Sequence, residues 1–382
     1  MVAAIVAAAW HAPYTCRFRV TAKRVSIGTM VDETHTFKAS CICGNISHEI
    51  SIRKADLPLK GYMCHCDSCR HMTGALCLTV TFLPAYYEPA KSLVEKLKGF
   101  QFSKRIIQYH CPTCGCQMMA RCVEDAEDPD SKVTWDATTG TLDDIDKHIG
   151  WQGHEFLSDT LDGGFADMLL EVHGKKLDRW PGRFGEGKDQ LPCGGVEFYV
   201  RRPSPGSVIV KEVWPNKSSA SDVTESDAPD SIEQYWLHDD HTKFPAGLCG
   251  CDSCRLASGV EATFWAFVPY MDINLDKEGE LPFKFEVGIE KLKKYTSSPG
   301  CHRYFCDTCA ATCFYMADDR KFMVDISVGL FAAAEGAKAL SWLSWRTSHM
   351  GFLEDTIPRA ERLSGGIGTA LKSWEQHLQS EN

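Results

Sequence analysis

The strongest chemical signal in the sequence is the stretch Cys64 to Arg70, which reads Cys-His-Cys-Asp-Ser-Cys-Arg. Thiolates select soft or borderline metal ions, and three thiolates leave one tetrahedral position of a zinc ion free. The spacing therefore predicts a zinc ion held by Cys64, Cys66 and Cys69, here called three-thiol site one. Its fourth position is either open, as in catalytic zinc sites, or closed by a further side chain. The candidates for closing it are Cys77, Cys116, Cys122 and His65.

A second copy of this motif occurs downstream, at Cys249 to Arg255. It keeps all three thiols, but Gly250 stands where the first copy has a histidine. We call Cys249, Cys251 and Cys254 three-thiol site two, and the same spacing argument predicts zinc there.

A different cysteine pattern predicts a structural zinc ion. Two thiol pairs, each followed by a glycine, lie far apart in the sequence: Cys41 with Cys43, and Cys111 with Cys114. Such pairs form closed four-thiolate sites, whose binding energy is largely folding energy. We call this set knuckle one.

The corresponding set in the second half of the chain, knuckle two, is incomplete. It keeps Cys193, Cys306 and Cys309, but Leu191 occupies the place of Cys41. Cys301 or Cys313 supplies the fourth ligand, or the site holds no metal. The whole chain is therefore expected to bind three to four zinc ions.

These paired motifs belong to a diverged tandem repeat. Residues 66–84 align with 251–269 at a shift of 185 positions, and residues 95–114 align with 290–309 at a shift of 195. Order is preserved while the loops between landmarks differ in length, as expected after duplication. The predicted division is as follows: a disordered or targeting extension at 1–30, a first zinc domain at 31–175, a linker at 176–190 and a second, diverged zinc domain at 191–382 with a mobile insertion at about 215–231.

Hydrophobic alternation predicts strands in both copies. Leu76–Phe82, Ile46–Ile52 and Val196–Val200 alternate, whereas Ala262–Val268 is apolar on both faces and is expected to be more deeply buried. The clearest helical pattern covers Thr369 to Leu378. The fold class is therefore mainly β, with metal ions tying loops between strands.

Composition limits the class of partner. The net charge of −10 argues against nucleic acid and anionic membranes, which attract basic surfaces, and no run is long enough to span a bilayer. Clustered cysteines favour metal sites over disulfides. Met1 to Trp10 is apolar, and basic residues follow before the first acid, Asp32, as in a mitochondrial presequence. A disordered extension is the simpler interpretation, so the predicted location is cytoplasmic, with mitochondrial as the alternative.

With these motifs in place, the chain resembles the glutathione-dependent formaldehyde-activating enzyme family, which includes centromere-protein-V-like proteins. Copy one carries the whole family pattern over residues 37–172, and copy two matches over 191–357 with the losses noted above. The matching segments of copy one are Cys41 to Gly44, Cys64 to Arg70, Cys111 to Gly115, Gly140 to Asp143 and His154 to Phe156.

The resemblance implies zinc-bearing β-tent domains, in which the knuckle zinc is structural and the three-cysteine zinc lies at the active site. It also implies addition of glutathione to formaldehyde, giving S-hydroxymethylglutathione, or more broadly carbon–sulfur lyase chemistry. A metal-bound thiol has a lowered pKa and is delivered as a thiolate. His65 or His71 could carry its proton, and Arg70 could pair with a substrate carboxylate.

The sequence therefore predicts a zinc-dependent carbon–sulfur lyase that acts on a glutathione-like thiol adduct, with copy one as the catalytic half. One alternative is a carrier that binds glutathione or another thiol without turnover. Another is a tailoring enzyme that uses the same zinc on a natural-product intermediate. An interaction protein, like the centromere relatives, is disfavoured by the acidic net charge.

Overall fold

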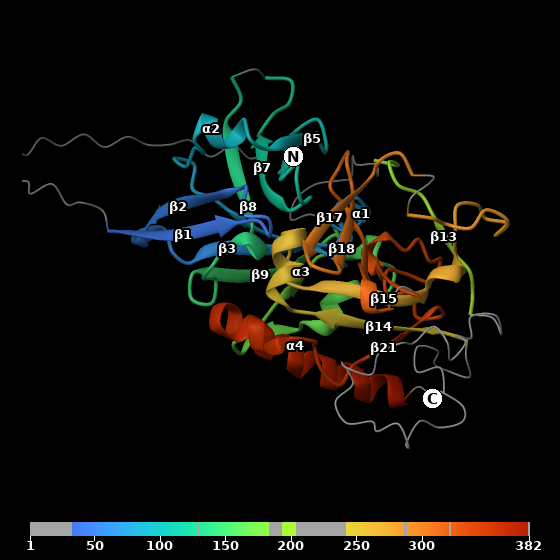
Figure 1. The fold of residues 1–382 in the computed structure, drawn as a ribbon. Coiled ribbons are helices and arrows are strands. Elements are labelled where there is room, and N and C mark those ends of the chain that lie inside the picture. Colours follow the sequence, from blue (N-terminus) through green and yellow to red (C-terminus); the bar gives the residue numbers. More distant parts are fainter. Residues whose placement is uncertain are drawn as a thin grey trace, which may run out of the picture.

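A computed structural model describes residues 33–128, 130–182, 193–203, 242–285, 289–320 and 322–380. The predicted extension at 1–30 and the predicted insertion at 215–231 lie outside these residues. Each copy contributes one large sheet, and the long helix α4 lies along the lower edge of the molecule in Figure 1. The prediction of a mainly β fold is confirmed.

Copy one forms an eight-stranded sheet in the order β12-β9-β3-β4-β8-β7-β6-β5. Its strands are antiparallel, except that β9 runs parallel to both β3 and β12. A separate hairpin carries the first two cysteines of knuckle one in its turn. The bounds are β1 Thr34–Ser40, β2 Ser47–Arg53, β3 Leu59–Cys64, β4 Leu78–Phe82, β5 Lys98–Gln101, β6 Ile106–His110, β7 Gln117–Val123, β8 Val133–Thr138, β9 Ile149–Glu155 and β12 Asp178–Arg179.

Copy two repeats this arrangement in a seven-stranded sheet, β17-β18-β19-β20-β15-β14-β21. Strand for strand, this order matches the order β5-β6-β7-β8-β4-β3-β9 in the sheet of copy one. The parallel pair β14 with β21 corresponds to the parallel pair β3 with β9. The strand register also shifts at corresponding positions in the two copies, directly after Tyr109 in copy one and directly after Tyr304 in copy two. The bounds are β14 Phe244–Cys249, β15 Thr263–Pro269, β17 Leu292–Ser298, β18 Cys301–Cys306, β19 Thr312–Ala317, β20 Met323–Ser327 and β21 Leu343–Trp345.

The helices are short apart from α4. They are α1 Asp67–Thr73, α2 Lys91–Val94, α3 Asp252–Ser258 and α4 Leu353–Ser380. The remaining strands are β10 Glu171–Val172, β11 Lys175–Lys176, β13 Tyr199–Val200 and β16 Ile273–Asn274. The 3-10 turns that matter below are η2 Thr139–Thr141, η4 Gly164–Met168 and η10 Val328–Leu330. None of the helices in the described ranges is long and apolar enough to cross a membrane.

Helices α1 and α3 are positioned by the cysteine motif itself. The Sγ atoms of Cys66 and Cys251 cap the two helices by accepting a hydrogen bond from the backbone N–H of Cys69 and Cys254, respectively. Each helix then ends at a glycine in the left-handed region, where a residue without Cβ is favoured. The metal-binding motif is therefore also the helix start signal.

Two sequence expectations need correction. Helix α4 begins at Leu353, well before the predicted Thr369, because Pro358 and the glycine-rich stretch hide the pattern; its backbone is kinked at Ala360. The alternating segment at 196–200 is a strand only at Tyr199–Val200. By contrast, β15 is almost wholly buried, as its two apolar faces predicted.

The two copies are joined by reciprocal contacts. Helix α1 packs on η10 of copy two, and α3 packs on η2 of copy one. The backbones touch there: the Gly140 N–H donates to the Gly259 carbonyl at 3.1 Å, and the Gly329 N–H donates to the Gly74 carbonyl at 2.9 Å. The buried hydrophobic residues of both copies form one cluster. The copies therefore share a core.

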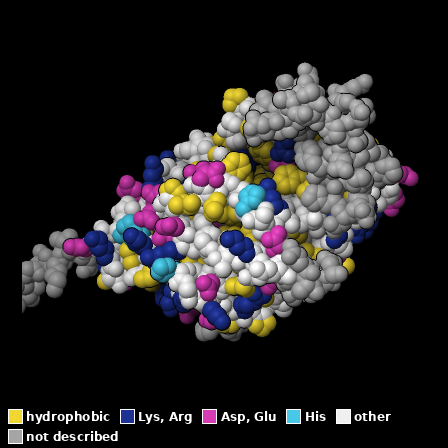
Figure 2. Space-filling view, turned by 90° about the horizontal axis from the view of Figure 1, so that it is seen from below, with side chains coloured by type: hydrophobic (Ala, Val, Ile, Leu, Met, Phe, Trp, Pro, Cys, Tyr) yellow, Lys and Arg dark blue, Asp and Glu magenta, His cyan; other side chains and the backbone are white. Residues whose placement is uncertain are grey.

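Further contacts tie the copies together at the periphery. Lys98 reaches Asp307 of copy two at 2.8 Å, and Lys338 of copy two reaches Asp167 of copy one at 2.6 Å. Helix α4 packs against η4 and β10 of copy one. The outer surface is mixed in charge, and in Figure 2 acidic and basic side chains are interspersed with hydrophobic ones on the face shown.

The close backbone contact makes a direct prediction. A Cβ atom at Gly140 would lie 2.5 Å from the Gly259 carbonyl carbon, so Gly140→Ala forces the copies apart. Such overpacking costs about 1–3 kcal/mol, and we expect this loss in the free energy of unfolding of the zinc-loaded chain, measured by denaturant titration. The matched control is Gly365→Ala in α4, where no atom lies within 4 Å. The control should stabilise the helix by up to about 1 kcal/mol. Equal stability of the two variants would contradict the interface.

Candidate metal centres and active site

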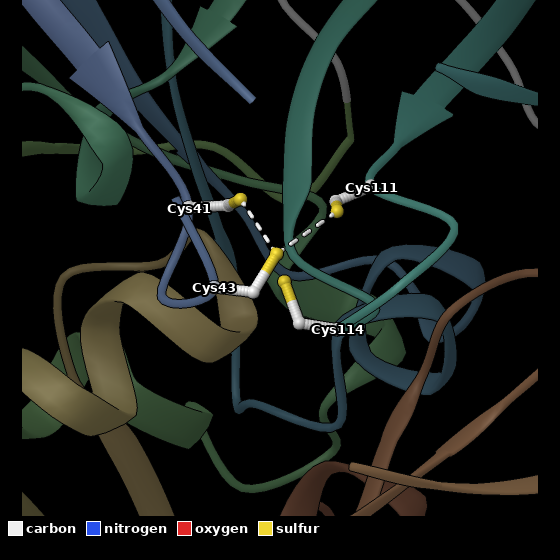
Figure 3. Close-up of side chains that lie close together, drawn as sticks. All are labelled: Cys41, Cys43, Cys111 and Cys114. Atoms are coloured by element: carbon white, nitrogen blue, oxygen red, sulfur yellow. Dashed lines mark hydrogen bonds between the residues drawn. The ribbon is translucent and has the colours of Figure 1, made fainter. Parts of the chain in front are cut away.

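Knuckle one has the geometry of a closed zinc site. The turn of the β1–β2 hairpin supplies Cys41 and Cys43, and the β6–β7 loop supplies Cys111 and Cys114. The four side chains point toward one another (Figure 3). The Sγ of Cys43 lies 3.4 Å from that of Cys41 and 3.6 Å from that of Cys111. Sulfurs in tetrahedral zinc sites lie about 3.8 Å apart, because each bond is about 2.3 Å long. The donor set and its spacing therefore fit zinc.

Three-thiol site one is assembled by the end of β3 and the start of α1. The Sγ atoms of Cys64, Cys66 and Cys69 lie within 4.8 Å of one another, with Cys64 and Cys66 at 3.6 Å. Hydrogen bonding from the Cys64 and Cys69 side chains, together with backbone N–H groups at the helix start, lowers the pKa of Cys66 to about 4. Among the described residues, no histidine, cysteine or carboxylate completes this group. None of the predicted fourth ligands therefore joins it.

A small cavity of about 90 Å³ opens beside this site, with Cys64 and Cys69 in its wall. The apolar face of β4 lines it through Leu78, Val80 and Phe82. The opposite face of β4 is buried, and the Thr79 hydroxyl on it accepts a hydrogen bond from the Glu261 N–H of copy two. Strand β4 thus directs its hydrophobic side chains to the cavity and Thr79 to the interface between the copies.

Four polar residues that the sequence did not single out as site residues also line the small cavity: Tyr62, Gln108, Asp136 and Glu155. They lie on β3, β6, β8 and β9, so only the strand order of the sheet brings them together. The sequence held a partial signal, since Asp136 recurs in copy two as Asp325. A carboxylate near a metal site is a candidate for proton transfer.

His65 lies outside the lining of the small cavity. It is fully buried, and its Nε2 lies 2.9 Å from Nδ1 of His154. Nε2 of His154 lies 2.8 Å from the Leu169 carbonyl, which can only accept, so His154 carries its proton there and accepts from His65. Burial lowers the pKa of His154 to about 4 and that of His65 well below its usual value. The pair is therefore neutral at pH 7 and fixes the backbone next to Cys64 and Cys66.

Copy two replaces this histidine pair with a packing contact. Gly250 corresponds to His65, and Met350 corresponds to His154. A Cβ atom on Gly250 would lie 2.8 Å from Cε of Met350, so the methionine fills the space that an imidazole occupies in copy one. At this place copy one therefore has a hydrogen-bonded pair of histidines, whereas copy two has an apolar contact between Gly250 and Met350.

The other two predicted catalytic residues also lie outside the small cavity. Arg70 is buried, and its Nη2 lies 2.6 Å from Oδ1 of Asp67. Its counterpart Arg255 donates from Nη1 to the Gly140 carbonyl at 2.7 Å and so bridges the two copies. Nδ1 of His71 lies 2.5 Å from the Asp67 carbonyl, and the side chain faces a larger cavity between the copies.

Three-thiol site two has the same three thiols within 4.8 Å of one another, but its open side is filled. Arg303, the counterpart of Gln108, places Nη1 and Nη2 3.6 and 3.7 Å from Sγ of Cys254. Tyr315 replaces Ala120, and Arg320 pairs with both carboxylate oxygens of Asp325 at 2.6 and 2.7 Å. The Cys249 and Cys251 side chains lower the pKa of Cys254, and the Arg303 guanidinium adds to this effect. Copy two therefore closes with protein side chains the space that copy one leaves open.

Knuckle two brings together three thiols. Sγ of Cys193 lies 3.8 Å from that of Cys306 and 3.1 Å from that of Cys309. Leu191 lies outside the described residues. Neither proposed fourth ligand joins the group: the Cys301 sulfur accepts a hydrogen bond from the Tyr315 hydroxyl, and Cys313 donates to the Ala311 carbonyl.

The exchange of polar and apolar pairs can be tested. His154→Met should destabilise the chain by about 1–3 kcal/mol, because the buried His65 loses its partner. His65→Gly/His154→Met recreates the pair of copy two, so its cost should fall short of the sum of the single variants by about 1 kcal/mol. Denaturant unfolding of all four chains gives the coupling energy, with zinc content as the control. Strictly additive costs would show that the two histidines do not interact.

Comparison with known families bears on the whole arrangement. The family model described as glutathione-dependent formaldehyde-activating enzyme matches residues 36–159 and 237–342, that is, both copies. Comparison with curated proteins and with solved structures found no match. The family match covers more than half of the chain and includes knuckle one and both three-thiol sites. The chain thus belongs to the glutathione-dependent formaldehyde-activating enzyme family, with two copies of the family domain in tandem.

Proposed function

We propose that copy one is a zinc-dependent active site that joins a glutathione-like thiol to a small carbonyl compound, or reverses that reaction. In the forward direction the thiol sulfur bonds to the carbonyl carbon, and the carbonyl oxygen takes up the proton that the thiol gives away. The product is an adduct of the S-hydroxymethylglutathione type, and the reverse reaction is that of a carbon–sulfur lyase. The observation that carries the proposal is the cavity beside three-thiol site one; at three-thiol site two the Arg303 guanidinium lies against Cys254 instead.

The residues present fit the chemistry. A zinc ion held by Cys64, Cys66 and Cys69 supplies an open position that lowers the pKa of a fourth, exogenous thiol. Glu155 and Asp136 line the same cavity and can accept and return the proton, while the Gln108 amide can donate to the carbonyl oxygen. The buried histidine pair acts as a positioning group behind the ligands. His65, Arg70 and His71 lie outside the cavity wall, so we assign the proton transfer to the carboxylates.

Cavity size favours a small carbonyl compound. The cavity of about 90 Å³ is several times the roughly 10–15 Å³ that one water molecule needs. This space suits a cysteine side chain and a one-carbon aldehyde, with the rest of a tripeptide outside. A larger natural-product intermediate fits less well. A thiol carrier without turnover is the remaining alternative, and the carboxylates in the cavity favour an enzyme over it. We place the protein in the cytoplasm, where thiols stay reduced, with mitochondria as the alternative.

Removing one ligand from each three-thiol site tests the assignment. Cys66→Ser should abolish glutathione binding and remove one zinc per chain, while the fold stays intact because knuckle one is unchanged. The matched control is Cys251→Ser, which alters the same position of copy two and should leave glutathione binding as it is. Calorimetric titration and metal analysis report both effects. Global unfolding of Cys66→Ser would point to a structural zinc, and loss of binding in Cys251→Ser would move the active site to copy two.

Transferring the blocking side chain to copy one provides a second test. Gln108→Arg places the copy-two residue beside three-thiol site one, so turnover of glutathione with formaldehyde should fall at least about 100-fold, in line with the loss of an active-site donor. Zinc content should not change. Gln101→Arg, at an exposed position on neighbouring β5, is the control and should retain full activity. Unchanged turnover in Gln108→Arg would contradict the placement of the substrate.

A further inference from the structure

A second, larger cavity of about 420 Å³ lies between the two copies. Helix α1 of copy one forms one wall through Ser68, His71 and Met72. All three cysteines of knuckle two form part of the opposite wall. The cavity therefore connects a thiol cluster of copy two with the helix that carries three-thiol site one.

Knuckle one, by contrast, lies against the opposing helix. The Ile42 N–H donates there to the Leu256 carbonyl of α3 at 2.9 Å. The residue at the place of Ile42 in copy two is Pro192, which has no N–H to donate. His71 takes the place of Leu256, and its side chain faces the cavity. The sequence of copy two thus lacks both the fourth cysteine of the knuckle and the backbone N–H that makes this contact in copy one.

Knuckle two presents three thiols and no fourth protein donor within the described residues. Its Sγ separations of 3.1 and 3.8 Å bring the three thiols close enough for one metal ion, and the longer separation matches the spacing of about 3.8 Å between zinc-bound sulfurs. Four protein ligands make a closed structural site, whereas three leave one position for an exchangeable ligand. All three cysteines line the cavity, so a ligand in the cavity can reach that position.

The walls indicate which ligand would fit. Six aromatic side chains line the space: Phe100, Phe102, Phe198, Tyr199, Phe331 and Trp342. Polar groups are few, and Glu197 disfavours an anionic body. A volume of about 420 Å³ lies within the range of small-molecule sites, about 300–1,000 Å³. The fitting ligand is a thiol on an uncharged, apolar body, unlike the charged tripeptide proposed for copy one.

We propose that Cys193, Cys306 and Cys309 form a second ligand-accepting zinc site, which binds an apolar thiol through the cavity between the copies. On binding, the thiol releases its proton to solvent, and its sulfur takes the fourth position on the metal. Knuckle two has thereby changed from a structural site into a ligand site. The proposal is independent of the reaction assigned to copy one.

The test uses the full chain loaded with cobalt, with Cys66→Ser and Cys251→Ser disabling the other three-thiol sites. Titration with benzyl mercaptan should change the cobalt absorption bands, because a fourth sulfur joins the metal. Glutathione should give no comparable change. Adding Cys193→Ser should remove one metal per chain and the spectral response together. A response that survives Cys193→Ser, or equal responses to both thiols, would overturn the proposal.

A pair of tryptophan variants keeps the test decisive if Cys193→Ser fails to fold. Ala333 lines the cavity, whereas Ala334 is exposed one residue further on and does not. Ala333→Trp should weaken benzyl mercaptan binding at least tenfold without changing the metal content. Ala334→Trp should bind as the parent chain does. Equal affinity of the two variants would show that the thiol does not enter this cavity.

Discussion

The structure depends on close backbone contact between its two copies. At each of the two reciprocal contacts a glycine of one copy lies against the backbone of the other, Gly140 against Gly259 and Gly329 against Gly74. Only residues without Cβ allow this approach. Because α1 and α3 carry the metal-binding cysteines and also pack on the opposite copy, the metal sites and the interface are built from the same short helices. The geometry of each site is therefore fixed partly by the other copy.

On this shared scaffold, a few substitutions separate an open site from a closed one. The two three-thiol sites have the same ligands, the same helix cap and the same strand order. Gln108 in copy one leaves room beside the thiols, whereas Arg303 in copy two fills that room and compensates the negative charge of the thiolates. A buried guanidinium needs such a partner, since burying an unpaired charge is costly. Copy two therefore gains a stabilising ion contact where copy one keeps space for a substrate.

The knuckles diverge in the opposite sense. Knuckle one is closed by four thiols and touches α3, whereas knuckle two lacks a thiol and faces a cavity. Copy one thus combines a closed knuckle with an open three-thiol site. Copy two combines a three-thiol site closed by Arg303 with a three-thiol knuckle that faces a cavity. A duplicated chain can divide its roles in this way because each copy supports the fold of its neighbour.

The sequence alone determined the motif chemistry. The cysteine spacings identified every thiol cluster that the structure assembles among its described residues, and the repeat predicted a second copy of the same domain. Tertiary structure decided what faces each cluster. Tyr62, Gln108, Asp136 and Glu155 meet because four strands lie side by side, and no local pattern encodes that meeting. It also turned His65 away from the cavity toward His154 and set Arg303 against Cys254. The physical reason is range: ligand spacing and helix caps act within a few residues, whereas the walls of a site are contributed by residues far apart in the chain.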